Sequence, residues 1–306
     1  MTKEPFTTIC VVGAGFMGTQ IGLQCAAHGY RVQLVDHLEE CLRRSTQYQS
    51  QELEQWRARG RITADEQASM LSRLSFTTQL DAGVSDAGLV IESAPEVLEI
   101  KRTIFAQLDA ACAGHTIFAS NSSSLRISAI ESATGRPDKV LNMHFYAPPW
   151  QRTMVELMKG TATSDETMAS AAHFARAIGL TPLLVLSEST GFIFNRVWRA
   201  IKKECLQLVD SGVASAADVD RAWMIANHHP VGPFGLMDMV GLDVVRDIEM
   251  VYFQESGDQS DAPPRLLLEK IEQGELGVKT GKGFYSYPHP AYQDPAWLSG
   301  ATDAGV

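Results

Sequence analysis

The stretch Thr8-Ile9-Cys10-Val11-Val12-Gly13-Ala14-Gly15-Phe16-Met17-Gly18 sets a short apolar run directly before a GxGxxG loop. Residues 9–12 predict a buried parallel strand, and the apolar residues spaced four apart from Met17 onward predict a helix that ends at Gly29. In such a loop, successive glycines permit a tight turn, close approach of a pyrophosphate, and close packing of helix on strand. The stretch therefore predicts a dinucleotide site at a helix N-terminus.

A second predicted strand, residues 32–35, ends in Asp36. The spacing from the glycine loop is close to the ~20 residues expected for a carboxylate that binds an adenosine ribose. Because a carboxylate would repel a 2′-phosphate, we expect NAD rather than NADP. The alternative is a glycine turn in an unrelated α/β fold. The residues predicted to contact the cofactor on this basis are Gly13, Ala14, Gly15, Phe16, Met17, Gly18 and Asp36.

Length and composition favour a two-domain soluble enzyme. The chain has 306 residues, 45% of them hydrophobic, and a net charge of −10, which argues against nucleic acid or an anionic membrane as the main partner. No apolar run of about 18 residues occurs, and Met1–Pro5 lacks the core of a signal peptide. The five cysteines are widely spaced, as expected of free thiols in a reducing compartment. We therefore expect a cytoplasmic protein, with no metal site except a remote possibility at His228-His229.

The remaining chain predicts alternating strands and helices, interrupted by one insertion and followed by helices alone. Helices at 39–59 and 64–74 form the insertion, an arm that could serve a ligand or another subunit. Further strands are predicted at 89–91, 116–119, 140–143, 154–158 and 182–186, and helices at 97–112, 125–131 and 164–179. Beyond Ser187 we expect helices at 191–211, from 215, at 236–251 and at 264–273, then an irregular tail over 288–306. The predicted domains are 1–187, an α/β Rossmann-type domain with an inserted helical arm, and 188–306, an all-α domain.

His144 and Glu156 stand out as candidate catalytic residues. His144 follows a predicted strand, and Glu156 shares one face of the next strand with two methionines, so it should be partly buried and need a partner. Such a pair suits a general base held in one tautomer, although a lone histidine is more often structural.

Two polar features remain ambiguous from pattern alone. The run Ser120-Asn121-Ser122-Ser123-Ser124 follows a strand, so it could place donors over the cofactor crevice or cap a helix, or do both. Asn195 faces away from the predicted core stripe of its helix, which includes Val197 and Ile201, and could face an interdomain cleft or solvent.

Several motifs in order resemble the L-3-hydroxyacyl-CoA dehydrogenase family, from about Ile9 to Tyr287. They read VVGAGFMG, VIESAPE, SNSSSL, MHFYAPP with MVEL, GFIFNRV, HPVGPFGLMD and GVKTGKGFYSY. The resemblance implies NAD-dependent, reversible oxidation of a 3-hydroxyacyl-CoA in fatty acid metabolism, by a homodimer with a His144-Glu156 catalytic pair. It also implies substrate contacts from Ser123 and Asn195, and cofactor contacts from Asp36, Ala94, Glu96, Lys101 and Lys279.

Two departures from the family pattern bear on the substrate. Where the family usually has HFFNP, this chain has His144-Phe145-Tyr146-Ala147-Pro148, so Ala147 replaces an asparagine. In the arm, the segment that usually supplies lysines to the CoA phosphates retains Arg59 at a basic position but has Gln55 at another, with two glutamates close by.

The run Ala147-Pro148-Pro149 is also similar to a motif of L-gulonate 3-dehydrogenase and carnitine dehydrogenase, relatives that act on 3-hydroxy compounds without CoA. A dehydrogenase of a free 3-hydroxy acid is therefore the alternative. A non-catalytic NAD-binding protein, like the lens crystallin relative, is a third possibility. It is disfavoured because His144, Glu156, Ser123 and Asn195 are all retained.

Overall fold

The computed structural model describes residues 6–300, and the chain forms two compact units that divide after Ile193. The prediction placed the domain boundary near Ser187. Met1–Pro5 and residues 301–306, on which the leader and tail predictions partly fell, lie outside the described residues.

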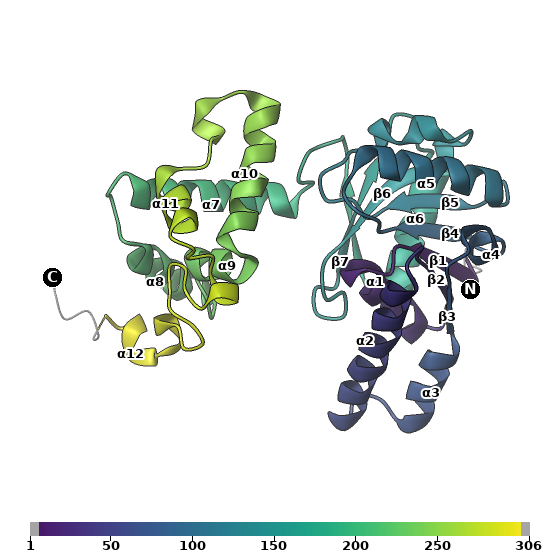
Figure 1. Ribbon diagram of the computed structural model, residues 1–306, viewed down its shortest axis with the longest axis horizontal. Coiled ribbons are helices and arrows are strands. Elements are labelled where there is room, and N and C mark those ends of the chain that lie inside the picture. The colour runs from purple at the N-terminus through teal and green to yellow at the C-terminus, as the bar shows by residue number, and fades with distance from the viewer. Residues whose placement is uncertain (1–5, 301–306) are drawn as a thin grey trace. The chain divides into compact units, whose positions relative to one another are not determined.

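The N-terminal unit is built on one eight-stranded sheet (Figure 1), in the order β3-β2-β1-β4-β5-β6-β7-β8. The first six strands in this order are parallel, β7 is antiparallel to β6, and β8 is parallel to β7. The strands are β1 Thr8–Val12, β2 Arg31–Val35, β3 Leu74–Thr77, β4 Leu89–Glu92, β5 Ile117–Ser120, β6 Val140–Phe145, β7 Met154–Lys159 and β8 Thr181–Val185. The order reverses between β1 and β4, which is where open α/β sheets bind ligands.

Helices cover both faces of this sheet, so strands such as β4, β5 and β6 are buried along their whole length. The helices α1 Phe16–Ala27 and α6 Asp165–Ala177 pack on one face, where Ile21 and Phe174 join a core with Ile9 and Val11. The helices α4 Leu80–Val84 and α5 Leu98–Ala111 pack on the other, where Phe105 contacts Phe118 edge to face.

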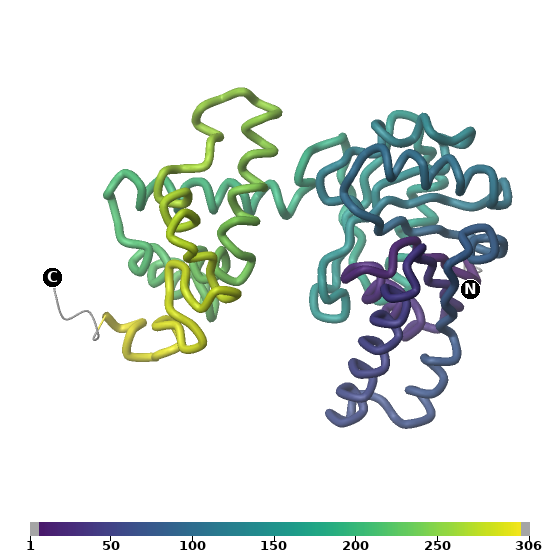
Figure 2. Tube along the Cα trace, in the orientation of Figure 1, coloured from purple at the N-terminus to yellow at the C-terminus, as the bar shows by residue number. Residues whose placement is uncertain are grey.

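The insertion forms a helical arm of α2 Glu39–Ala58 and α3 Ala64–Ser72, which extends away from the sheet (Figures 1 and 2). The arm is anchored on α1, since Leu53 and Trp56 are buried in a cluster with Leu23. The Gln49 side-chain amide also donates to the Thr19 carbonyl at 2.8 Å. The arm is therefore packed against the helix that follows the glycine loop.

The C-terminal unit is helical. Its helices are α7 Phe194–Asp210, α8 Ala216–Asn227, α9 Pro233–Val240, α10 Leu242–Ser256, α11 Arg265–Glu272 and the short α12 Pro295–Leu298. Their core gathers Leu206, Phe234, Leu267, Tyr285 and Trp297, all of which are buried. The predicted fold class, an α/β domain with a helical arm followed by an all-α region, is confirmed.

Several predicted elements were wrong in detail within the sheet domain. The edge strand β3 and the short helix α4 were missed, because their polarity is mixed and neither is fully buried. The helix expected at 125–131 is instead two 3-10 turns, Ile127–Ala129 and Glu131–Ala133.

The predictions for the helical unit also needed correction. The helix expected at 236–251 is broken at Gly241, whose positive φ of 101° interrupts the helical path. On α7 the buried side chains are Lys202, Cys205 and Leu206, whereas Val197 is 56% exposed and does not belong to the core stripe. The described part of the tail contains α12 and a buried Trp297, so that part is not irregular.

Within residues 6–300, no helix combines the length and apolarity needed to cross a bilayer. The same part of the chain contains no cluster of three or more histidine, cysteine or acidic side chains suited to a metal ion.

Candidate active site

The glycine loop connects β1 to α1, and its three glycines are needed for different reasons. Gly13 has φ of 101°, and a Cβ there would lie 2.6 Å from the Ser93 carbonyl oxygen. A Cβ on Gly18 would lie 1.8 Å from the Gly13 carbonyl oxygen, so helix and strand could not pack as they do. A Cβ on Gly15 would meet nothing within 4 Å. Packing within the protein thus explains Gly13 and Gly18, whereas Gly15 leaves open space over the loop for a ligand.

Asp36 joins the end of β2 to this loop. Its carboxylate accepts hydrogen bonds from the Ala14 and Leu38 backbone amides, both at 2.9 Å. It also borders a cavity of about 420 Å³ that includes Gly13, Gly15 and Ala94. A glycine loop at a helix N-terminus beside a carboxylate and a cavity of this size fits a dinucleotide.

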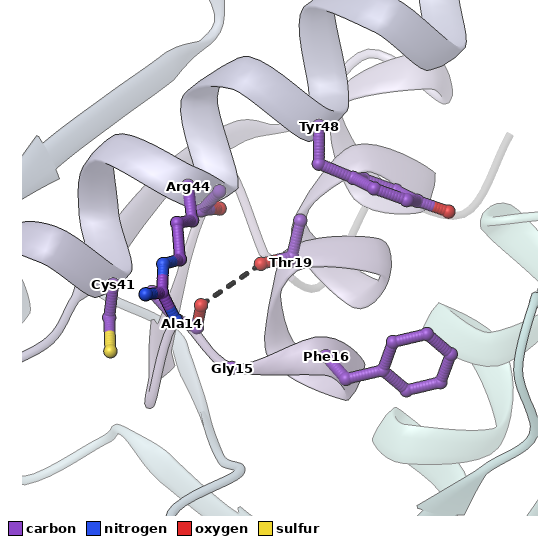
Figure 3. Close-up of a pocket in the computed structure, with 8 residues that line it drawn as sticks. Ala14, Gly15, Phe16, Thr19, Cys41, Arg44 and Tyr48 are labelled. Carbon is purple, nitrogen blue, oxygen red and sulfur yellow. Dashed lines mark hydrogen bonds between the residues drawn. The ribbon is translucent and has the colours of Figure 1, made fainter. Parts of the chain in front are cut away.

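The arm faces the same loop across a second cavity, of about 240 Å³ (Figure 3). The loop contributes Ala14, Gly15 and Phe16, and α2 contributes Cys41, Arg44, Ser45 and Tyr48. The Thr19 hydroxyl donates to the Ala14 carbonyl at 3.0 Å and so ties α1 to the loop. Arg44 is paired with Glu40 at 2.7 Å.

A buried ion pair lies where β4 ends. Lys101 of α5 is only 1% exposed, and its ammonium group lies 2.7 Å from Glu92 and 3.3 Å from Glu96. The Glu92 carboxylate, equally buried, also accepts from the Ser120 hydroxyl and the Ala94 amide, both at 2.7 Å. Every oxygen of Glu92 is thus satisfied, which a buried carboxylate requires. Lys101 is held in place by these contacts.

Two serines of the run 120–124 donate hydrogen bonds to Glu96. The Ser122 and Ser124 hydroxyls and the Ser124 amide all donate to one Glu96 oxygen. Partial burial alone would raise the pKa of Glu96, but the serine hydrogen bonds and the charge of Lys101 outweigh it and lower that pKa. These serines therefore do not cap a regular helix. Ser123 is exposed, and its hydroxyl makes no hydrogen bond to another described residue.

His144 and Glu156 are directly opposite each other in the antiparallel pairing of β6 with β7. The imidazole Nδ1 lies 3.0 Å from Glu156 Oε2. Glu156 is completely buried, and its other oxygen accepts from the Ile193 amide at 2.9 Å. With Nδ1 engaged, Nε2 is the nitrogen left for a ligand.

A cavity of about 290 Å³ brings several predicted residues together within the N-terminal unit. It is lined by Met17, Ser93, Ala94, Glu96, Lys101, Asn121, Ser123, His144 and Phe145. The candidate base, the exposed serine and the end of the glycine loop therefore border one space.

Three further predicted residues belong to the C-terminal unit or to the arm. Asn195 is the second residue of α7, and Lys279 is paired with Asp243 at 2.5 Å, both in the C-terminal unit. Arg59 is exposed and directly follows α2 in the arm.

Three residues of the site received no individual role in the sequence analysis. Tyr146 donates its hydroxyl to Glu156, Glu92 anchors Lys101, and Asn121 accepts the Phe145 amide at 2.9 Å. All three lie inside the family motifs VIESAPE, SNSSSL and MHFYAPP. Their positions in these motifs were the only sequence evidence for a role.

Comparison with known proteins identifies the family. The model of the 3-hydroxyacyl-CoA dehydrogenase NAD binding domain matches residues 8–189, and that of the family's C-terminal domain matches residues 191–287. A 3-hydroxybutyryl-CoA dehydrogenase of Clostridioides difficile is 35% identical over 91% of this chain and 99% of its own length.

Two solved structures show similar architecture. The (S)-3-hydroxybutyryl-CoA dehydrogenase of Ralstonia eutropha is 32% identical, with a TM-score of 0.87 over 93% of this chain and 100% of that one. A diketoreductase, described as acting on dicarbonyl compounds, is 31% identical, with a TM-score of 0.82 over 94% and 100%.

The chain therefore belongs to the 3-hydroxyacyl-CoA dehydrogenase family. It is an NAD-dependent oxidoreductase of that family, so the predicted family, enzyme class and cofactor are confirmed.

Proposed function

We propose that this protein oxidises the 3-hydroxyl group of a short L-3-hydroxyacyl-CoA, reversibly, with His144 as the general base. The observation that carries the proposal is the His144-Glu156 hydrogen bond, which orients Nε2 as the free nitrogen of a ring that borders the cavity beside the glycine loop. A neutral imidazole held in one tautomer can accept the hydroxyl proton at Nε2.

Glu156 would stabilise the imidazolium that forms. Its carboxylate is buried, so its attraction for a positive ring is weakly screened. NAD, when bound, supplies the acceptor for the hydride from the substrate carbon. In the reverse direction the His144 imidazolium returns its proton to the developing alkoxide at the same nitrogen.

The other predicted residues would bind and orient. Ser123 lines the cavity with a free hydroxyl that would hold the reacting oxygen, and the family resemblance assigns the same role to Asn195. Lys101 and Glu96 border the same cavity and would contact the cofactor, as would Lys279. Asp36 would bind the adenosine ribose in the larger cavity.

We infer that the arm binds the CoA phosphates through Arg59. The positive electrostatic field of the arm is weak. Arg57 already pairs with Glu54 at 2.5 Å, and Glu52 accepts from the Trp56 indole at 2.7 Å. Arg59 has no such acidic partner among the described residues. An exposed arginine of this kind contributes about 1 kcal/mol or less.

We also propose a homodimer in the cytoplasm. The family resemblance supports the dimer. The location is supported by the five free cysteines, which suit a reducing compartment.

The decisive experiment compares NADH oxidation with acetoacetyl-CoA and with free acetoacetate. The proposal expects much higher kcat/KM with the CoA ester. Arg59→Gln should raise KM for acetoacetyl-CoA roughly two- to fivefold, and the matched change Glu54→Gln should lower it, because exposed charges interact over a Debye length of about 8 Å. Both effects should shrink in high salt and with 3′-dephospho-CoA esters.

A second candidate is a dehydrogenase of a free 3-hydroxy acid or a dicarbonyl compound. Ala147 in place of the family asparagine, the paired charges of the arm and the diketoreductase likeness favour it. Equal kcat/KM with acetoacetate and acetoacetyl-CoA, together with an unchanged KM in Arg59→Gln, would establish this candidate in place of the first.

A further inference from the structure

The carboxylate of Glu156 has a partner beyond His144. The Tyr146 hydroxyl donates to Glu156 Oε2 at 2.8 Å, and this is the same oxygen that lies 3.0 Å from His144 Nδ1. With the Ile193 amide on Oε1, both oxygens of the buried carboxylate accept hydrogen bonds. Such donors favour the ionised form of a carboxyl group.

Tyr146 also contacts the imidazole through its ring. The ring centroids of His144 and Tyr146 are 4.6 Å apart at an interplanar angle of 61°. Phe192 packs on the imidazole as well, with centroids 4.9 Å apart and rings inclined by 31°. The Tyr146 and Phe192 rings therefore restrain the His144 imidazole, while the Tyr146 hydroxyl donates to the Glu156 carboxylate that the imidazole contacts.

The hydroxyl is a feature of this chain. Where the family motif reads HFFNP, the second phenylalanine is replaced by Tyr146. A phenylalanine could supply the ring contact but not the hydrogen bond. The ring packing and the hydrogen bond can thus be separated by one substitution.

We propose that Tyr146 is a positioning residue that sets the pH range in which His144 works as a base, by sharing the Glu156 oxygen that orients it. This inference rests on the proposed general-base role of His144. The hydroxyl draws negative charge from Oε2, so the carboxylate attracts the imidazolium proton less strongly. Without the hydroxyl, the imidazole should retain its proton to higher pH.

Other charged groups near the imidazole are unchanged by this substitution. Lys101 and Glu96 line the same cavity, whereas Glu92 does not line it and is paired with Lys101. Glu156 is the one acid in direct contact with the ring among the described residues. A shift caused by Tyr146→Phe is therefore attributable to the Tyr146-Glu156 hydrogen bond.

The test follows the titration of His144 in two ways. One is the pH dependence of the imidazole Cε1 proton resonance in the free protein, and the other is the acidic limb of the kcat/KM profile for oxidation of 3-hydroxybutyryl-CoA. Tyr146→Phe should move both midpoints upward by roughly half a pH unit. The plateau kcat should fall by less than about tenfold, with KM nearly constant.

A matched control is Tyr30→Phe. Tyr30 is also buried and packs on Phe174, but it precedes β2, at the opposite end of the sheet strands from the cavity. Neither midpoint should move in this variant. If Tyr146→Phe does not fold, 3-fluorotyrosine at position 146 keeps the ring, strengthens the donor and should move both midpoints downward.

Unchanged midpoints in Tyr146→Phe, with a lower melting temperature alone, would overturn the inference and leave Tyr146 a packing residue. The resonance titration needs no substrate. A failure of the wild-type protein to oxidise acyl-CoA would therefore refute the proposed function, while the titration still decides the role of Tyr146.

Discussion

Two of the buried carboxylates in each unit can be compared, and the groups that satisfy them differ. In the N-terminal unit, Glu92 and Glu156 accept mainly from side chains, including Lys101 and His144, that border a cavity. In the C-terminal unit, Asp220 and Asp238 each accept from two backbone amides and a tyrosine hydroxyl.

The C-terminal carboxylates hold loops together. Asp220 binds the amides at the start of α9, and Asp238 binds those of Phe284 and Tyr285. A Cβ on Gly283 would lie 2.1 Å from the Asp238 carboxylate, so the motif glycine there permits a close contact. The family motifs HPVGPFGLMD and GVKTGKGFYSY thus contain residues needed for folding.

Burial also changes the proton affinity of the C-terminal pair. Burial raises the pKa of Asp220 to about 6 despite its hydrogen bonds, and also raises the pKa of Asp238. Neither aspartate has a direct ion pair among the described residues. A buried acid is therefore no indication of catalysis by itself, and what sets Glu92 and Glu156 apart from this pair is that their donors Lys101 and His144 border a cavity.

The largest expected effect is on the catalytic side of this comparison. His144→Ala should lower kcat by roughly 10³-fold or more, because the base is lost, while the Kd for NADH changes by less than about threefold. Steady-state kinetics and NADH fluorescence titration would measure both. His115→Ala, an exposed histidine of the same unit, is the control. Substantial turnover in His144→Ala would show that Glu156 does not support a catalytic base, and the contrast with Asp220 and Asp238 would be lost.

On the structural side, Asp220→Ala should lower the free energy of unfolding by roughly 3–4 kcal/mol, since two buried amides and the Tyr285 hydroxyl lose their acceptor. Urea denaturation would measure the loss. Asp247→Ala, which removes an exposed acid paired only with its neighbour Arg246, should change it by less than about 0.5 kcal/mol. Similar losses in the two variants would contradict the role assigned to Asp220.

The raised pKa of Asp220 predicts the sign of a pH effect. The folded state binds the Asp220 proton more tightly than the unfolded state does. The free energy of unfolding therefore decreases as pH rises from about 4, the pKa in the unfolded chain, to about 6, the pKa in the folded protein. The advantage of wild type over Asp220→Asn should therefore shrink by up to about 3 kcal/mol between pH 4 and 7. Urea denaturation of both proteins at several pH values would measure it. A constant difference would show that Asp220 does not titrate in this range.

The smallest expected effect concerns Asp36. Its carboxylate accepts from backbone amides, like Asp220 and Asp238, but lies beside a cavity, like the donors to Glu92 and Glu156. Asp36→Ala should narrow the preference for NAD over NADP roughly tenfold, as expected for one hydrogen bond to a charged group. The ratio of kcat/KM values measures it, with Asp86→Ala as an exposed control. Equal use of both cofactors by the wild-type protein would refute the assignment to Asp36.

Much of the N-terminal fold was predictable because its signals are local. Residues 9–12 are continuously apolar, Gly13 needs a positive φ, and Asp36 follows a strand at a fixed distance from the loop. The strand β3 and the break at Gly241 were not predicted, since one is a short edge strand of mixed polarity and the other depends on a single backbone angle.

By itself, the sequence determined the alternation of strands and helices, the glycine loop, the cofactor class and the candidate pair His144 and Glu156, because periodicity and motif spacing are written along the chain. Only the tertiary structure decided that β7 runs antiparallel to β6 and sets these two residues opposite each other. It also decided that Tyr146 shares the Glu156 oxygen and that Asp220 and Asp238 hold loops. The physical reason is that a hydrogen bond depends on which atoms meet within about 3 Å, and this is set by strand register and packing between residues far apart in sequence.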